Sequence, residues 1–196
     1  MKRTRIYRLF AATALAVLIL SAPGAARIVT RDEARNIAAN YIALIVEATG
    51  GWGETTSASV GDIEELRRGE RLLGYWCHIE PAGHIVVSLH DELAPVKASS
   101  ETWDGDPSCE GDMFDVIKIK IEQEHDYIEA RIGPVETAPP GSVADLCEID
   151  YRDDWDRLSR DPEDFERSSM LAGALADYQE GGVMLTTEWN QTDPYN

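Results

Sequence analysis

Residues 72–89 read LLGYWCHIEPAGHIVVSL. The first eight are rich in aromatic and branched side chains, which favour extended strands. EPAG at residues 80–83 is typical of a turn, and HIVVSL at residues 84–89 is a second run of strand-forming residues. This stretch predicts a β-hairpin, and residues 91–98 are expected to continue it in extended form, with Pro95 indicating an edge or a bend.

Before the hairpin, the sequence predicts a helix. Thr30 and Glu33 have the spacing of a capping box, in which the Thr hydroxyl binds an orphan amide and the Glu side chain reaches back. Apolar side chains then recur at three- and four-residue steps as far as Ile45, and Gly50 is a typical helix end. The apolar stripe is expected to face a core rather than a partner.

After the hairpin, residues 112–131 fit two patterns. Residues 116–121 alternate like a strand, whereas the apolar spacing and charged surroundings over the whole stretch suit a helix of about five turns. We favour the helix, because the stretch is long for a strand and Gly133 with Pro134 is a usual helix stop. The expected fold class is α+β: an antiparallel sheet with packed helices over residues 27–132, followed by a loosely attached, partly helical acidic connector, residues 133–182.

The charge balance excludes some partners. The 196-residue chain has 18 Lys and Arg against 36 Asp and Glu, a formal net charge of −18. Nucleic-acid binding needs cations to contact phosphates, and this surface would repel them. Anionic membrane surfaces are disfavoured for the same reason. We therefore expect no nucleic-acid partner and no membrane binding after processing.

The N-terminus has the three parts of a secretory signal peptide. Residues 1–8 are cationic, residues 9–20 are apolar, and residues 21–26 are small side chains that suit signal peptidase. The alternative is a membrane anchor, but a run of about 12 apolar residues is short for the roughly 20 that span a bilayer. The sequence predicts cleavage between Ala26 and Arg27 and a secreted or periplasmic location.

Export makes disulfides permissible for the three cysteines. Three is an odd number, so at least one thiol is unpaired within a monomer. Cys77 lies in the first strand and is expected to be a small buried hydrophobe. Cys109 and Cys147 could form a bridge between a loop and the connector. No Cys-x-x-Cys spacing supports a zinc site.

A search for catalytic and metal-binding motifs finds little. The chain has no Gly-x-Ser-x-Gly elbow, no phosphate-binding loop and no His-Glu-x-x-His. His78, His84 and His90 lie close in sequence, so a metal site at the hairpin is conceivable, but ordinary strand histidines are the better interpretation. The acidic stretch 150–166 lacks calcium-loop spacing. We expect no metal and no cofactor.

The last eight residues read WNQTDPYN and carry a family resemblance. Trp189, Gln191, Pro194, Tyr195 and Asn196 resemble the opening of the catalytic domain of streptopain-like secreted cysteine peptidases. The resemblance assigns residues 183–196 to the start of that domain and places its nucleophilic Cys and His further downstream. By analogy with papain-like enzymes Gln191 is an oxyanion-donor candidate, and the alternative is a structural turn.

The order of segments from Val29 to Arg131 resembles the propeptide of the same peptidases, which also occurs as a stand-alone inhibitor. The resemblance implies four parts: a signal peptide (1–26), a propeptide or inhibitor-like domain (27–132), the connector (133–182) and the truncated catalytic start (183–196). The implied function is to keep a peptidase latent and to assist its folding. The implied partners are signal peptidase and the chain's own catalytic domain, or a cognate cysteine peptidase for the stand-alone alternative.

Two loops are the candidates for entering the peptidase cleft: Glu80–Gly83 and Trp103–Gly111. The 196 residues on their own are expected to have no peptidase activity. A third alternative is an unrelated acidic exported domain, for which both resemblances are coincidence.

Overall fold

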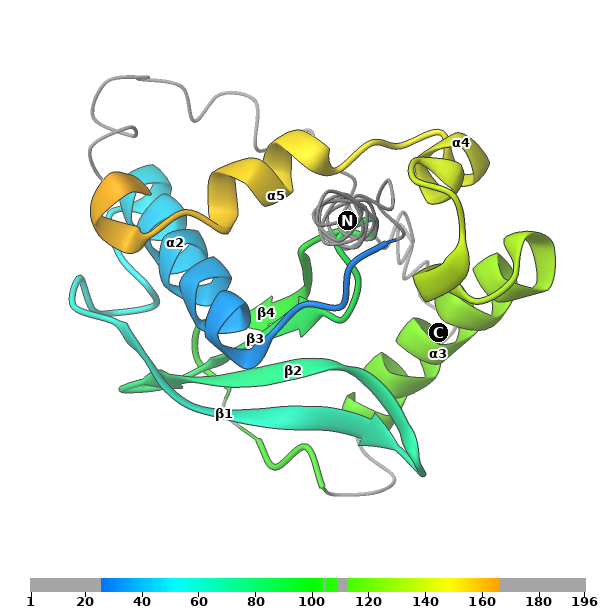
Figure 1. Ribbon diagram of the computed structural model, residues 1–196. Coiled ribbons are helices and arrows are strands. Elements are labelled where there is room, and N and C mark those ends of the chain that lie inside the picture. Colours follow the sequence, from blue (N-terminus) through cyan, green and yellow to red (C-terminus); the bar gives the residue numbers. More distant parts are fainter. Residues whose placement is uncertain (1–25, 104, 109–112, 166–196) are drawn as a thin grey trace, which may run out of the picture.

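The computed structural model describes residues 26–103, 105–108 and 113–165, and it confirms the α+β class (Figure 1). Its elements are α2 (Arg31–Thr49), β1 (Ser59–Arg68), β2 (Arg71–Glu80), β3 (His84–Ser88), β4 (Val96–Ser100), α3 (Met113–Ile132), the 3-10 turn η1 (Val135–Thr137), α4 (Ser142–Cys147) and α5 (Arg152–Leu158). The four strands form one antiparallel sheet in the order β1-β2-β3-β4. Every strand therefore pairs with its neighbour in sequence.

The predicted hairpin is the centre of this sheet. β2 and β3 pair antiparallel, with Tyr75 opposite Val87 and His78 opposite His84. Because side chains alternate along a strand, Tyr75 and Cys77 face one side of the sheet while Trp76 faces the other. All five residues of β3 are buried, as expected of a strand covered on both faces.

Helix α2 covers the first face of the sheet and begins as predicted. Thr30 is its N-cap and forms both halves of the capping box with Glu33. The helix ends at Gly50, whose φ of 88° lies in the left-handed region that glycine adopts without strain. Ile37 and Ile42 are among the α2 residues that pack into the main apolar cluster with Tyr75. The prediction of a core-facing helix is thus confirmed.

Strand β1 was not expected from the sequence. Of its ten residues only Ile63 and Leu66 are buried, so the apolar alternation that marks a strand is weak. Two arginines of α2 bind its main chain: Arg31 donates to the carbonyl oxygen of Ile63, and Arg35 donates to that of Gly61 at 3.1 Å. These contacts join α2 to the part of β1 where its register with β2 shifts, between Val60 and Ile63.

Helix α3 covers the second face. Phe114 and Ile121 pack with Trp76 and Val86 in a second apolar cluster. The helix ends before Gly133, whose φ is 82°. Of the two patterns over residues 112–131, the helical one is therefore correct.

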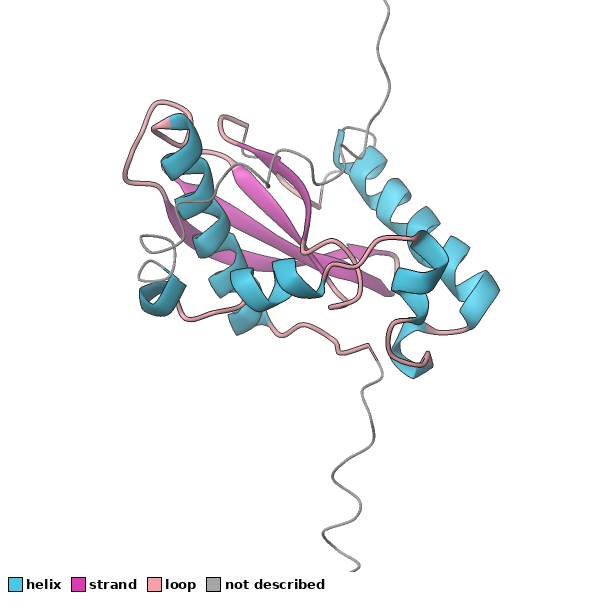
Figure 2. Cartoon of the chain, turned by 90° about the horizontal axis from the view of Figure 1, so that it is seen from above, coloured by secondary structure: helices cyan, strands magenta, loops and turns pink. Residues whose placement is uncertain are grey.

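The chain beyond residue 133 was expected to be loosely attached, and for residues 133–165 that expectation is wrong. Val135 and Val143 are buried with Ile128 of α3. Trp155, Leu158 and Phe165 belong to the main core with α2, and α5 lies beside α2 in both views (Figures 1 and 2). The prolines interrupt regular hydrogen bonding for only a few residues, and the apolar side chains that follow bring the chain back to the core.

The domain that the structure describes therefore continues past residue 132 to at least residue 165. The rest of the connector and the segment 183–196 lie outside the described residues. Within residues 26–103, 105–108 and 113–165, no helix has the length and apolar content to cross a bilayer.

Candidate functional site

Three loops meet at one end of the sheet. They are the α2–β1 loop, the β2–β3 turn and the segment after β4. The indole N–H of Trp52 donates to the carbonyl oxygen of Ala82 at 3.0 Å, and the main-chain N–H of Gly53 donates to a carboxylate oxygen of Glu101 at 2.8 Å. We call this region the loop end. It surrounds a hollow of about 370 Å³, lined by Trp52, Glu54, Thr55, Pro81, Ala82, Glu101 and Thr102.

Gly83 allows the loops to come this close. Its φ is 104°, which only glycine adopts readily. A Cβ atom at this position would overlap the carbonyl oxygen of Ser100 and lie 3.0 Å from the indole nitrogen of Trp52. The glycine that the sequence places in the hairpin turn thus permits contact between the turn and both neighbouring loops.

The loop end has the chemistry of a binding surface. Trp52 is 1% exposed and lines the hollow, while Glu54 is exposed and Glu101 is half-buried. Its lining includes the Thr55 hydroxyl and no Ser, Cys or His. The indole of Trp52 and the carboxylates of Glu54 and Glu101 give the hollow both apolar and charged groups that could contact part of another molecule.

Of the two loops predicted to enter a cleft, Glu80–Gly83 contributes Pro81 and Ala82 to the loop end. The second, Trp103–Gly111, starts beside it. Nδ1 of His84 lies 2.7 Å from the carbonyl oxygen of Trp103, and the Trp103 ring stacks on Phe114 at 4.4 Å between centroids. Trp103 is 39% exposed. Residues 104 and 109–112 of this loop lie outside the described residues.

Two of the three histidines of the hairpin region come together: His78 and His84 lie opposite each other on β2 and β3, and both rings contact Trp76. His78 pairs with Glu64 at 3.0 Å, and the His84 ring stacks on Trp76 at 4.0 Å between centroids. His90 lies apart from them, 5.3 Å from the ring centroid of His125 on α3. No group of three or more His, Cys, Asp or Glu that could hold a metal ion occurs in the part of the chain that the structure describes.

The cysteines differ in their surroundings. Cys77 is fully buried, as predicted, and burial raises the pKa of its thiol to about 12, so the thiolate is suppressed at neutral pH. Cys147 is half-buried at the end of α4, and burial raises its pKa as well. Cys109 lies outside the described residues, so its bridge to Cys147 stays a prediction.

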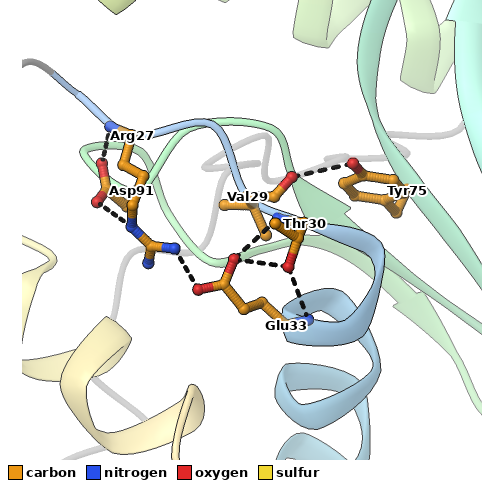
Figure 3. A network of polar contacts seen from close by, with 6 residues as sticks. All are labelled: Arg27, Val29, Thr30, Glu33, Tyr75 and Asp91. Atoms are coloured by element: carbon orange, nitrogen blue, oxygen red, sulfur yellow. Dashed lines mark hydrogen bonds and ion pairs between the residues drawn. The ribbon is translucent and has the colours of Figure 1, made fainter.

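Arg27 is held in a network of hydrogen bonds and ion pairs at the start of the domain (Figure 3). Its main-chain N–H donates to Oδ1 of Asp91 at 2.8 Å, and its guanidinium pairs with Glu33. Two residues on, the carbonyl oxygen of Val29 accepts a hydrogen bond from the hydroxyl of Tyr75 at 2.9 Å. Ala26, on the other side of the predicted cleavage point, is buried.

The structure also contains two buried side chains whose contacts the sequence did not indicate. The first is Trp52, which lies between Gly51 and Gly53 in a stretch without strand or helix periodicity. The second is Lys97: its side chain is fully buried and its Nζ lies 2.7 Å and 2.9 Å from the two carboxylate oxygens of Glu124. Nothing in the strand pattern of residues 91–98 indicated that this charge would be enclosed.

Comparison with known proteins finds no protein-family model, no curated protein and no solved structure that matches this chain. The terminal motif residues Trp189, Gln191, Pro194, Tyr195 and Asn196 lie outside the described residues. The resemblance to streptopain-like peptidases therefore rests on the sequence alone.

Proposed function

We propose that this chain is the signal and propeptide portion of a secreted streptopain-like cysteine endopeptidase, and that its loop end covers the peptidase cleft. The observation that carries the proposal is the meeting of three loops around one hollow. Glu80–Gly83, one of the two candidate cleft loops, contributes to its lining. The catalytic Cys and His are expected downstream of Asn196. The chain by itself then inhibits and assists folding, and it hydrolyses nothing.

The chemistry of the peptidase explains why such a cover is needed. A papain-like nucleophile is a thiolate beside an imidazolium, which would attack proteins of the producing cell if its cleft were open. A covalently attached domain is present at an effective concentration of the order of millimolar, so a modest intrinsic affinity is enough. The hydrogen bonds of Trp52 and Gly53 already join the three loops, so ordering them on binding costs little further conformational entropy, which favours the loop end as the contact surface.

The alternative, a stand-alone exported inhibitor, is favoured by one observation. Residues 133–165 pack on the domain through Trp155, Leu158 and Phe165. The resulting unit has its own core beyond the predicted propeptide boundary, as a free-standing inhibitor requires.

The test is inhibition in trans by residues 27–196. The target is the catalytic domain encoded after residue 196 or, where the reading frame closes there, a streptopain-like peptidase encoded separately in the same genome. Inhibition supports the proposal, and the location of the target gene separates the propeptide from the stand-alone inhibitor. Both the propeptide and the stand-alone inhibitor are overturned if the peptidase keeps full activity with residues 27–196 at a high micromolar concentration. They are also overturned if the genome encodes no such peptidase.

A matched pair of variants assigns the contact surface. Glu54→Arg changes an exposed charge at the loop end, and Asp153→Arg makes the same type of change on α5, away from the hollow. We expect the first to weaken inhibition at least tenfold and the second to leave it within about twofold, with circular dichroism unchanged in both, since surface changes rarely alter folding. Equal inhibition by the two variants would remove the loop end from the interface.

A further inference from the structure

The bond at which we expect signal peptidase to cut, Ala26–Arg27, is followed by a network with more carboxylates than cations (Figure 3). Asp91 accepts the main-chain N–H of Arg27 at 2.8 Å and lies 3.5 Å from its Nε. Glu33 pairs with the same guanidinium. The two carboxylate side chains are each 27% exposed. One cation thus serves two partly enclosed anions.

Cleavage would change the charge of one atom in this network. Water adds its oxygen to the carbonyl carbon of Ala26, the C–N bond breaks, and the nitrogen of Arg27 keeps the bonding electron pair and takes up protons. At neutral pH the products are a carboxylate on the departing Ala26 and an α-ammonium on Arg27. The amide that donates to Asp91 in the uncut chain becomes a full positive charge in the cut one.

We propose that Asp91 is the binding site for the α-ammonium of Arg27, and that removal of the signal peptide completes this ion-pair network. The inference rests on the export step of the proposed function. Once the chain is cut, two cations face two carboxylates: the ammonium beside Asp91 and the guanidinium beside Glu33. A charged donor strengthens a hydrogen bond to a carboxylate relative to a neutral amide.

Ala26 packs in an apolar cluster with Leu93 and Ile128, but the residues from Arg27 onward form bonds of their own that hold the Arg27 nitrogen in place. The main-chain N–H of Asp91 donates to the carbonyl oxygen of Arg27 at 3.2 Å, and that of Val29 donates to Leu89 at 2.8 Å. The hydroxyl of Tyr75 holds the carbonyl oxygen of Val29. These bonds join the segment to β2 and to the end of β3, so the new terminus is expected to stay beside Asp91.

The ion pair predicts a specific pH dependence. The charged groups around the Arg27 nitrogen are Asp91, which follows β3, Glu33 of α2, and the guanidinium of Arg27 itself, with His90 next to Asp91 in the chain. Asp91 should raise the pKa of the α-amine above its ordinary value of about 8. For a raised pKa, the added stability is present below the unfolded-state pKa and is lost as the pH rises through the folded-state pKa.

The experiment compares chains 27–196 and 24–196, both by thermal unfolding at pH 7 and at pH 10. The longer chain keeps a neutral amide at Arg27 and the buried Ala26, so the change between the two pH values is compared rather than the absolute midpoint. We expect the midpoint of chain 27–196 to fall by about 2–4 °C more than that of chain 24–196. An equal fall in the two chains overturns the proposal.

Variants assign the effect to the carboxylate. Asp91→Asn should abolish the extra decrease in the unfolding midpoint of chain 27–196 between pH 7 and pH 10. Asp153→Asn, which removes an exposed charge on α5, should leave that extra decrease unchanged. An Asp91→Asn chain that keeps the extra fall contradicts the assignment. If Asp91→Asn does not fold, the comparison of the two chain lengths with Asp91 intact still decides.

Sequencing the N-terminus of the exported chain separates this inference from the proposed function. If the exported chain starts at Arg27 but Asp91→Asn does not change the pH dependence of the unfolding midpoint, only the inference about Asp91 is overturned. A start at another residue overturns the ion pair together with the predicted cleavage point. An exported chain that starts at Arg27 and carries the Asp91 effect, yet inhibits no peptidase, supports the inference and removes the propeptide function.

Discussion

Trp155 donates its indole N–H to the carbonyl oxygen of Leu93 at 2.6 Å, and both residues are buried. The bond joins α5 to the chain between β3 and β4, 62 positions earlier. Nearby, the amide of Asn40 on α2 donates to the carbonyl oxygens of Leu158 and Arg160 at 2.8 Å and 2.9 Å. The acidic segment is therefore held by specific polar contacts as well as by its apolar side chains.

The first prediction tests this attachment. Trp155→Phe should keep most of the apolar contact but leave the buried carbonyl of Leu93 without its donor, at a cost of about 1–3 kcal/mol in the free energy of unfolding. Trp155→Ala should cost about 3–5 kcal/mol. Urea denaturation measures both. A Trp155→Phe chain as stable as the parent would show that the hydrogen bond contributes nothing.

The second prediction concerns truncation. A chain of residues 27–132 lacks Trp155, Leu158 and Phe165, so it would expose the part of the core on α2 that these residues cover. We expect this chain to bind a hydrophobic dye and to be degraded by protease faster than residues 27–165, which should resist as one unit. Equal resistance of the two chains would restore a domain boundary at residue 132.

Local signals predicted α2 and the central hairpin correctly because their information lies within a few residues. The Thr30–Glu33 capping box and the EPAG turn are examples. Strand β1 could not be predicted in this way, since only Ile63 and Leu66 are buried and the strand depends on its pairing with β2. The loop end joins segments about 30 and 50 residues apart, and no local pattern encodes that meeting.

The third prediction concerns the buried ion pair of Lys97 and Glu124. The Lys97 side chain is fully buried and burial lowers its pKa, while the Glu124 side chain is 32% exposed. Breaking a buried pair costs about 3–5 kcal/mol when it leaves one charge without a partner. Because Glu124 is partly exposed, we expect Glu124→Gln to lower the free energy of unfolding by an amount at or below the lower end of this range.

Two controls distinguish a buried charge from general disruption. Glu65→Gln breaks an exposed pair with Arg67 and should cost less than about 1 kcal/mol. Combining Lys97→Met with Glu124→Gln removes both charges and should be less destabilising than Glu124→Gln alone. Lys97→Met alone is measured as well. If the double variant loses as much free energy of unfolding as the two single variants together, the role of the buried charge is contradicted.

The fourth prediction concerns acid stability and the two buried imidazoles. Nδ1 of His90 and Nε2 of His125 are buried without a hydrogen-bond partner among the described residues. Burial lowers the pKa of both rings, and that of His125 falls to about 3. His90, Lys97 and Arg71 lower the pKa of His125 further, while Asp126 raises it. For His90, Glu136 is the largest opposing influence.

The sign follows from where the protons bind. An unfolded histidine takes up its proton near pH 6.5, whereas folded His125 stays neutral until about pH 3. The contribution of neutral His125 to the free energy of unfolding is therefore fully present above pH 6.5. It is lost as the pH decreases from about 6.5 to about 3. In this window, the part of the slope of the free energy of unfolding against pH that is due to His125 approaches about 1.4 kcal/mol per pH unit.

Urea denaturation between pH 7 and pH 5 measures this slope before most carboxylates are protonated. His125→Gln should reduce the slope by about the amount that one buried histidine contributes, and adding His90→Gln should flatten it further. The pH 7 stability of these variants provides the reference, because any packing change acts equally at both pH values. If His125→Gln keeps the parent's slope, the acid sensitivity arises elsewhere, and the carboxylates of this strongly acidic chain would be the next groups to test.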